Sequence, residues 1–83
     1  MEITPTKVPR VIGKQGSMLT LIKDLTRCQI YVGQNGRIWL DGDDRDTAIA
    51  ALAIRLIDER AQAVGLTEAV RELIERARGP RPS

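Results

Sequence analysis

The sequence of 83 residues contains no histidine, no phenylalanine and a single cysteine, Cys28. One cysteine permits no internal disulfide, and without histidine or further cysteines the ligands of most zinc sites are missing. No stretch approaches the roughly 18 to 20 consecutive apolar residues that a transmembrane helix needs, and the N-terminus lacks the features of a signal peptide. We therefore expect one cytoplasmic domain without a metal ion or a cofactor.

Charge is small overall but uneven along the chain. The net charge is +2, yet the first 37 residues carry six basic and two acidic side chains, whereas the remainder carries seven arginines and nine acids. A basic N-terminal half on a nearly neutral chain indicates an anionic partner that is held locally. The alternative is an ordinary scatter of charges on a solvated surface.

The spacing of apolar and turn residues predicts most of the elements. Residues 1–7 alternate loosely and predict a short strand, and residues 9–12 predict one helical turn that stops at a glycine. Ser17 is a favourable N-cap for a helix that runs to about Thr26. Two runs, 28–32 and 37–40, flank the sequence Gly-Gln-Asn-Gly, which is typical of a β-hairpin.

The acidic stretch DGDDRD, residues 41–46, raises the question of a metal site. Arg45 falls where a calcium loop has a ligand and no glutamate closes the loop, so a turn and a helix cap at Asp43 or Asp44 fit better. The helix that follows is expected to end near Val64, with Gly65 as its C′ residue. Thr67 is expected to cap a last helix.

Gly13 and Gly16 separate two helical segments in the stretch VIGKQGSM. Two glycines inside a continuous helix would cost about 1 kcal/mol each relative to alanine, so a sharp turn is the better interpretation. A helix–GxxG–helix unit lets the backbone approach a partner that a Cβ atom would hold away. With the amides at the start of the second helix and the charge of Lys14, this corner suits a phosphate.

The stretch VIGKQGSMLTLIKDLTRCQIYV, residues 11–32, resembles a type I KH domain, whose signature is VIGxxG followed by a helix and a strand. More narrowly, VPRVIGKQGSM, VGQNGRIWLDG and AIRLIDERAQAVGLTEAV are similar to the KH domain of the RNA-binding cap subunit of the archaeal exosome. The element order itself indicates an α+β fold. The resemblance implies a three-stranded antiparallel sheet covered on one face by helices (β-α-α-β-β-α), with residues 1–65 as the KH domain, 66–78 as an appended helix and 79–83 as a disordered tail.

The resemblance also implies a site. In KH domains the GxxG loop clamps the backbone of about four single-stranded nucleotides over a narrow apolar groove. Bases would lie on aliphatic side chains, which agrees with the scarcity of aromatic residues, since other RNA-binding sheets stack bases on Phe or Tyr. The implied RNA-binding residues are Pro9, Arg10, Gly13, Lys14, Gln15, Gly16, Leu19, Lys23, Ile30 and Val32.

The chain departs from the family pattern in two respects. Many KH sequences have glycine just after the second helix, where Arg27 stands here, so we expect either a left-handed residue or a different turn. Exosome cap subunits also carry further domains before the KH domain. The chain is therefore expected to be an excised or standalone domain, and contact with the exosome ring subunits is expected only of a longer chain.

Three classes of function follow. The favoured one is a single-stranded RNA-binding module, from an exosome that degrades and processes RNA. A structural or protein-docking KH domain with little RNA affinity is the alternative, in which Leu19, Ile30 and Val32 are simply core, and Tyr31 and Trp39 pack against a helix or a neighbouring domain. An enzyme is not expected, because no nucleophile and base pair is evident.

Overall fold

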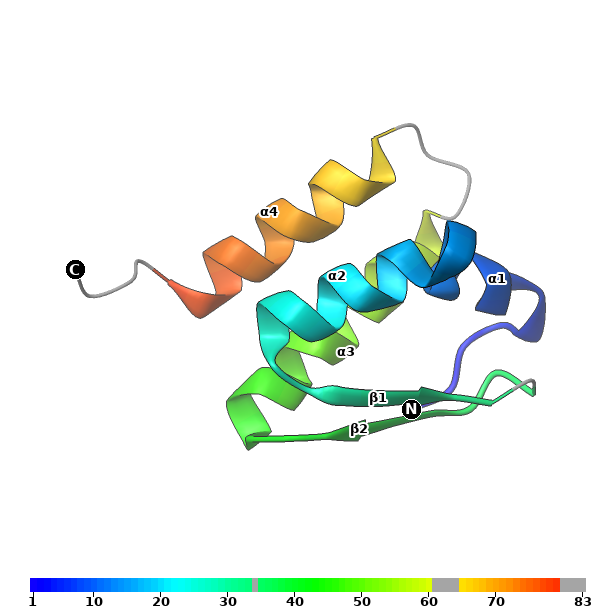
Figure 1. Cartoon of the computed structure of the whole chain (residues 1–83), viewed down its shortest axis with the longest axis horizontal. Coiled ribbons are helices and arrows are strands. Elements are labelled where there is room, and N and C mark those ends of the chain that lie inside the picture. The colour runs from blue at the N-terminus through cyan, green and yellow to red at the C-terminus, as the bar shows by residue number, and fades with distance from the viewer. Residues whose placement is uncertain (34, 61–64, 80–83) are drawn as a thin grey trace.

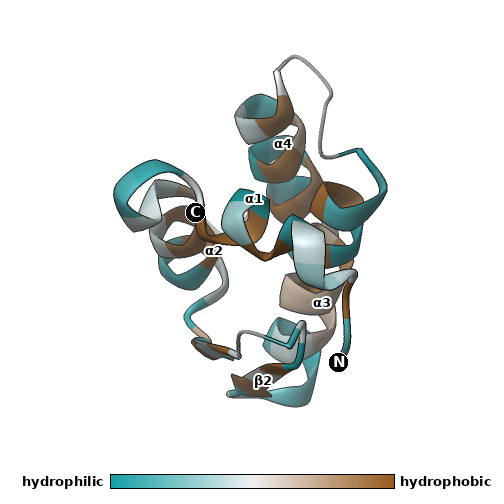
Figure 2. Cartoon of the chain, turned by 90° about the vertical axis from the view of Figure 1, so that its right-hand side faces the viewer, coloured by the Kyte–Doolittle hydropathy of each residue, from teal (hydrophilic) through white to brown (hydrophobic). Residues whose placement is uncertain are grey.

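The structure is a computed structural model and describes residues 1–33, 35–60 and 65–79 (Figure 1). Its elements are α1 (Val8–Ile12), α2 (Ser17–Thr26), β1 (Gln29–Val32), β2 (Ile38–Asp41), α3 (Asp44–Glu59) and α4 (Leu66–Arg78), with 3-10 turns at Pro5–Lys7 and Lys14–Gly16. Helices α2 and α3 contact the hairpin, and α4 packs on α2 and α3. Figures 1 and 2 show the hairpin on one side of α2 and α3 and α4 on the other.

The two strands form an antiparallel hairpin in which Tyr31 lies opposite Trp39 and Ile30 lies opposite Leu40. Residues that alternate along a strand point to opposite faces. Ile30 and Ile38 accordingly face the helices and are buried. Tyr31 and Trp39 lie on the outer face, where 58% and 55% of their surface is exposed.

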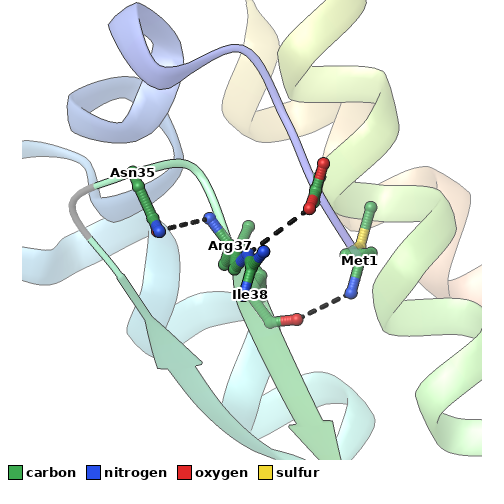
Figure 3. A network of polar contacts seen from close by, with 5 residues as sticks. Met1, Asn35, Arg37 and Ile38 are labelled. Atoms are coloured by element: carbon green, nitrogen blue, oxygen red, sulfur yellow. Dashed lines mark hydrogen bonds and ion pairs between the residues drawn. The ribbon is translucent and has the colours of Figure 1, made fainter.

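Among the residues that the structure describes, the expected third strand is not formed, and the sheet has two strands. Residues 1–3 run antiparallel to β2 but make only an isolated bridge, in which Glu2 lies opposite Arg37 and their side chains form an ion pair at 3.4 Å. The Met1 ammonium donates to the carbonyl of Ile38 at 2.8 Å (Figure 3). Regular pairing stops because Pro5 has no N–H to donate and begins a 3-10 turn.

The hairpin turn is stabilised by bonds around Arg37. The N–H of Gly33 donates to the carbonyl of Arg37 at 2.7 Å. The side-chain oxygen of Asn35 accepts from the N–H of Arg37 at 3.2 Å (Figure 3). The predicted hairpin is therefore confirmed, with its strands one residue later than expected at each start.

The core is aliphatic, as the composition predicts, and it draws on every helix. Val70 and Ile74 of α4 are fully buried in the same cluster as the residues of α2, α3 and the hairpin. Helix α4 is also tied at its C-terminal end, where the Arg78 guanidinium donates to the carbonyl of Leu25 in α2. Arg45 of α3 donates to the carbonyl of Arg78 at 2.9 Å. The last helix therefore shares one core with the rest of the chain.

Several helix ends differ from the sequence expectations. Helix α2 ends at Thr26 as predicted but begins one residue earlier, because Gly16 and not Ser17 is its N-cap. Helix α3 ends at Glu59, and the expected end near Val64 lies outside the described residues. Gly65 precedes α4 in a left-handed conformation and is its N-cap, so its assignment as C′ of α3 and the assignment of Thr67 as the cap of α4 are both wrong.

Arg27, at the position where glycine was expected from the resemblance, adopts a left-handed conformation with φ of 59° and ψ of 26°. A non-glycine residue in this region costs roughly 1–2 kcal/mol. Its N–H donates to the carbonyl of Lys23 at 2.7 Å and closes the last turn of α2. The first of the two expected alternatives is therefore confirmed.

Candidate nucleic-acid interface

The GxxG loop joins α1 to α2 and turns the chain sharply between them. Gly13 has φ of 76° and ψ of 175°, and both Gln15 and Gly16 are left-handed, with φ of 56° and 78°. The N–H of Gly16 donates back to the carbonyl of Gly13 at 3.2 Å. This geometry leaves the side chains of Lys14 and Gln15 exposed.

Gly13 is required by the fold itself. A Cβ atom at this position would lie 2.6 Å from the backbone nitrogen of Met18 and 2.7 Å from its Cβ atom. Glycine at position 13 is therefore required inside the fold, and its expected contact with RNA stays a prediction. The missing side chain lets the first turn of α2 pack directly against the end of α1.

Gly16 differs from Gly13 because the space beside it is open. A Cβ atom there would meet no heavy atom within 4 Å, although the positive φ still favours glycine. The corner is not covered by another part of the described chain at this point. A phosphate or sugar can therefore approach the backbone at Gly16.

The two glycines should respond differently to alanine. Gly13→Ala combines a backbone clash with a conformation that is nearly exclusive to glycine, and we expect a loss of about 3 kcal/mol in the free energy of unfolding. Gly16→Ala meets no clash and should lose about 1 kcal/mol. Urea denaturation followed by circular dichroism measures both values, and equal losses would show that the two positions are not distinguished by packing.

The other predicted residues occupy several elements around this corner. Pro9 and Arg10 are exposed on α1. Leu19 and Lys23 are half-buried on α2, and they lie on the same face of this helix because they are four residues apart. Val32 is half-buried at the end of β1. The proposed groove residues therefore lie on α1, the loop, α2 and β1.

Ile30 has a different environment from its neighbours in the predicted site. Only 3% of its surface is exposed, and its side chain belongs to the core cluster. Of the two predicted residues on β1, only Val32 is partly exposed. Burial of this kind could not be read from the alternation, because Ile30 and Val32 share a face of the strand.

A pocket of about 330 Å³ lies next to the loop. On one side it is lined by four predicted residues, Pro9, Arg10, Gly13 and Lys14, and on the other by Leu66 and Thr67 from the start of α4. Leu66 and Thr67 were not among the predicted site residues, because no local pattern indicates where the last helix packs.

Comparison with known proteins decides the family. The sequence model described as KH domain matches residues 1–46, more than half of the chain. The chain belongs to the KH domain family. The GxxG corner, the helix that follows it and the β1–β2 hairpin are therefore the parts of a KH domain.

The similar proteins include exosome components from archaea. The chain is 50% identical to the exosome complex component Rrp4 of Methanothermobacter thermautotrophicus over 96% of its length, and 51% identical to that of Methanothermus fervidus over 90%. It covers 26% and 34% of those relatives. A crystal structure assigned to an exosome complex RNA-binding protein matches with a TM-score of 0.89 and 47% identity, over 94% of this chain and 45% of the other.

The chain thus spans about a quarter to a third of the curated relatives it matches. Within the described ranges, no group of three or more acidic or cysteine side chains could hold a metal ion. No described helix has both the length and the apolar character to cross a bilayer.

Proposed function

We propose that this KH domain binds single-stranded RNA in the cytoplasm as a non-catalytic module of an RNA-binding cap subunit of an archaeal exosome, and so serves RNA degradation and processing. One observation carries the proposal: the GxxG corner is open at Gly16 and flanked by the exposed side chains of Lys14 and Gln15. The similarity to exosome components supports the assignment to that assembly.

Each proposed site residue has a role that follows from its place. Gly13 holds the corner in shape, and Gly16 lets a phosphate approach the backbone. Lys14, Arg10 and Lys23 supply positive charge, and Gln15 donates from its amide. The bases lie against the aliphatic side chains of Leu19 and Val32, beside Pro9 and above the buried Ile30.

A second candidate function is protein docking, with the exosome ring subunits or another part of a longer chain as partners. It is favoured by Tyr31 and Trp39, which lie opposite each other and are more than half exposed. Exposed aromatic side chains are enriched in protein interfaces. An NMR titration with short A- and U-rich RNA distinguishes the two functions, because RNA bound in the groove shifts amides of the GxxG loop and not those around the two aromatic residues.

RNA affinity should fall steeply with salt. A single strand that places about four phosphates on the domain gives a slope of roughly −3 for log affinity against log salt. Fluorescence anisotropy of a labelled RNA between low and moderate salt measures this slope. Binding that does not change with salt would mean that phosphates are not held at the corner, and the proposal would fail.

A further inference from the structure

The pocket between the GxxG loop and α4 has features of a binding site in its own right. Its polar lining consists of the cations Arg10 and Lys14 and the hydroxyl groups of Ser17 and Thr67, while Met18 and Leu66 contribute apolar surface. Its volume of about 330 Å³ lies at the small end of the range for pockets that hold organic ligands. Cations and hydroxyl groups beside an apolar surface suit a ligand with both a phosphate and a flat ring.

This pocket lies on a different side of α2 from the proposed groove. With 3.6 residues per turn, Ser17 points about 160° away from Leu19 and about 120° away from Lys23, two residues that are proposed to line the groove. The two sites meet at α1 and the GxxG loop, because four predicted RNA-binding residues also line the pocket: Pro9, Arg10, Gly13 and Lys14. A strand whose phosphate lies at Lys14 can therefore continue from the groove into the pocket.

Helix α4 forms a well-fixed wall for this pocket. Its buried residues Val70 and Ile74 and the bond from Arg78 to the carbonyl of Leu25 hold it against α2. The acidic residue nearest its start, Glu68, lies 3.5 Å from the guanidinium of Arg71 in an exposed ion pair. Thr67 thus faces the pocket from a helix that the rest of the fold keeps in place.

We propose that this pocket is a subsite for one additional nucleotide of single-stranded RNA, next to the nucleotides held in the groove, and that α4 determines how long an RNA the domain prefers. The inference rests on the proposed RNA-binding function. It adds Ser17, Met18, Leu66 and Thr67 to the residues that contact RNA.

The test uses the whole 83-residue chain, a four-nucleotide RNA, and two six-nucleotide RNAs that extend it at the 5′ or the 3′ end. The additional nucleotide in the pocket should tighten binding by about tenfold, which corresponds to about 1.4 kcal/mol, when the RNA is extended at one of its ends. Thr67→Asp should remove this gain, because a carboxylate in the pocket repels the phosphate. Thr67→Asn, which has the same shape without the charge, should keep it.

The loss of the affinity gain in Thr67→Asp should not come from unfolding of the domain. An aspartate in the first turn of a helix interacts favourably with the helix dipole, so Thr67→Asp should fold as the parent does, which a thermal scan verifies. Because Thr67 lines the same pocket as Arg10 and Lys14, the gain from extension is measured within each variant, as the ratio of its affinities for the six-nucleotide and four-nucleotide RNAs. Gln29→Glu adds the same charge at the start of β1, beyond the C-terminal end of α2, and serves as the control.

The outcomes separate the two proposals. Failure of the parent to bind the four-nucleotide RNA would overturn the RNA-binding function itself. Binding of that RNA without any gain from extension, or a gain that Thr67→Asp leaves intact, would overturn the subsite while the function stands. A gain that is lost in Thr67→Asp and kept in Thr67→Asn and Gln29→Glu supports the subsite.

Discussion

Replacing Lys14 and Gln15 together by aspartate should abolish the binding of short single-stranded RNA. The double variant changes the charge of the corner by three units and removes the donors that face the phosphates, so an affinity loss of at least about 100-fold is expected. Anisotropy titration with a labelled A- and U-rich RNA measures the loss.

The same variant should melt at nearly the parent temperature. Both side chains are exposed, and Gln15 is already left-handed, a conformation that aspartate tolerates better than most residues. Loss of binding would then report contact with RNA and not unfolding. A thermal scan by circular dichroism provides this measurement.

A matched control variant has the same net charge as the corner variant. Arg55→Glu with Gln29→Glu makes an equal change at two exposed positions outside the proposed site. This variant should lose only the small part of the affinity that long-range charge supplies. If the corner variant bound RNA as well as the parent, the clamp at the GxxG loop would be disproved.

Shortening Ile74 to alanine should destabilise the entire domain. Ile74 is on α4 and is fully buried, with 0% of its surface exposed. Truncation of such a side chain costs about 2–5 kcal/mol, and for a chain of this size each 1 kcal/mol corresponds to about 4–8 °C in the melting temperature. We therefore expect the melting temperature to fall by at least about 10 °C.

The neighbouring exposed residue is the control. Glu75→Ala removes a solvated side chain and should change the free energy of unfolding by less than about 0.5 kcal/mol. If Ile74→Ala cost no more than this control, α4 would be an appendage, as the proposed boundary after residue 65 implies. A single cooperative transition that shifts as a whole would instead make α4 part of the KH unit.

The sequence alone predicted the parts of the fold that depend on neighbouring residues. The bounds of α2 follow from apolar residues at helical spacing after Gly16, and the β1–β2 hairpin follows from alternation on either side of an Asn-Gly turn. Each of these depends on the conformational preferences of a few adjacent residues, which do not need the rest of the chain.

Features that depend on residues far apart in the chain were decided only by the tertiary structure. Residues 1–3 have a strand-like pattern, but their partners on β2 are more than 30 residues away, and only one bridge forms. The start of α4 lies beside the GxxG loop because Val70 and Ile74 are buried in the shared core, and a helical pattern states that a face is apolar without stating what it will cover.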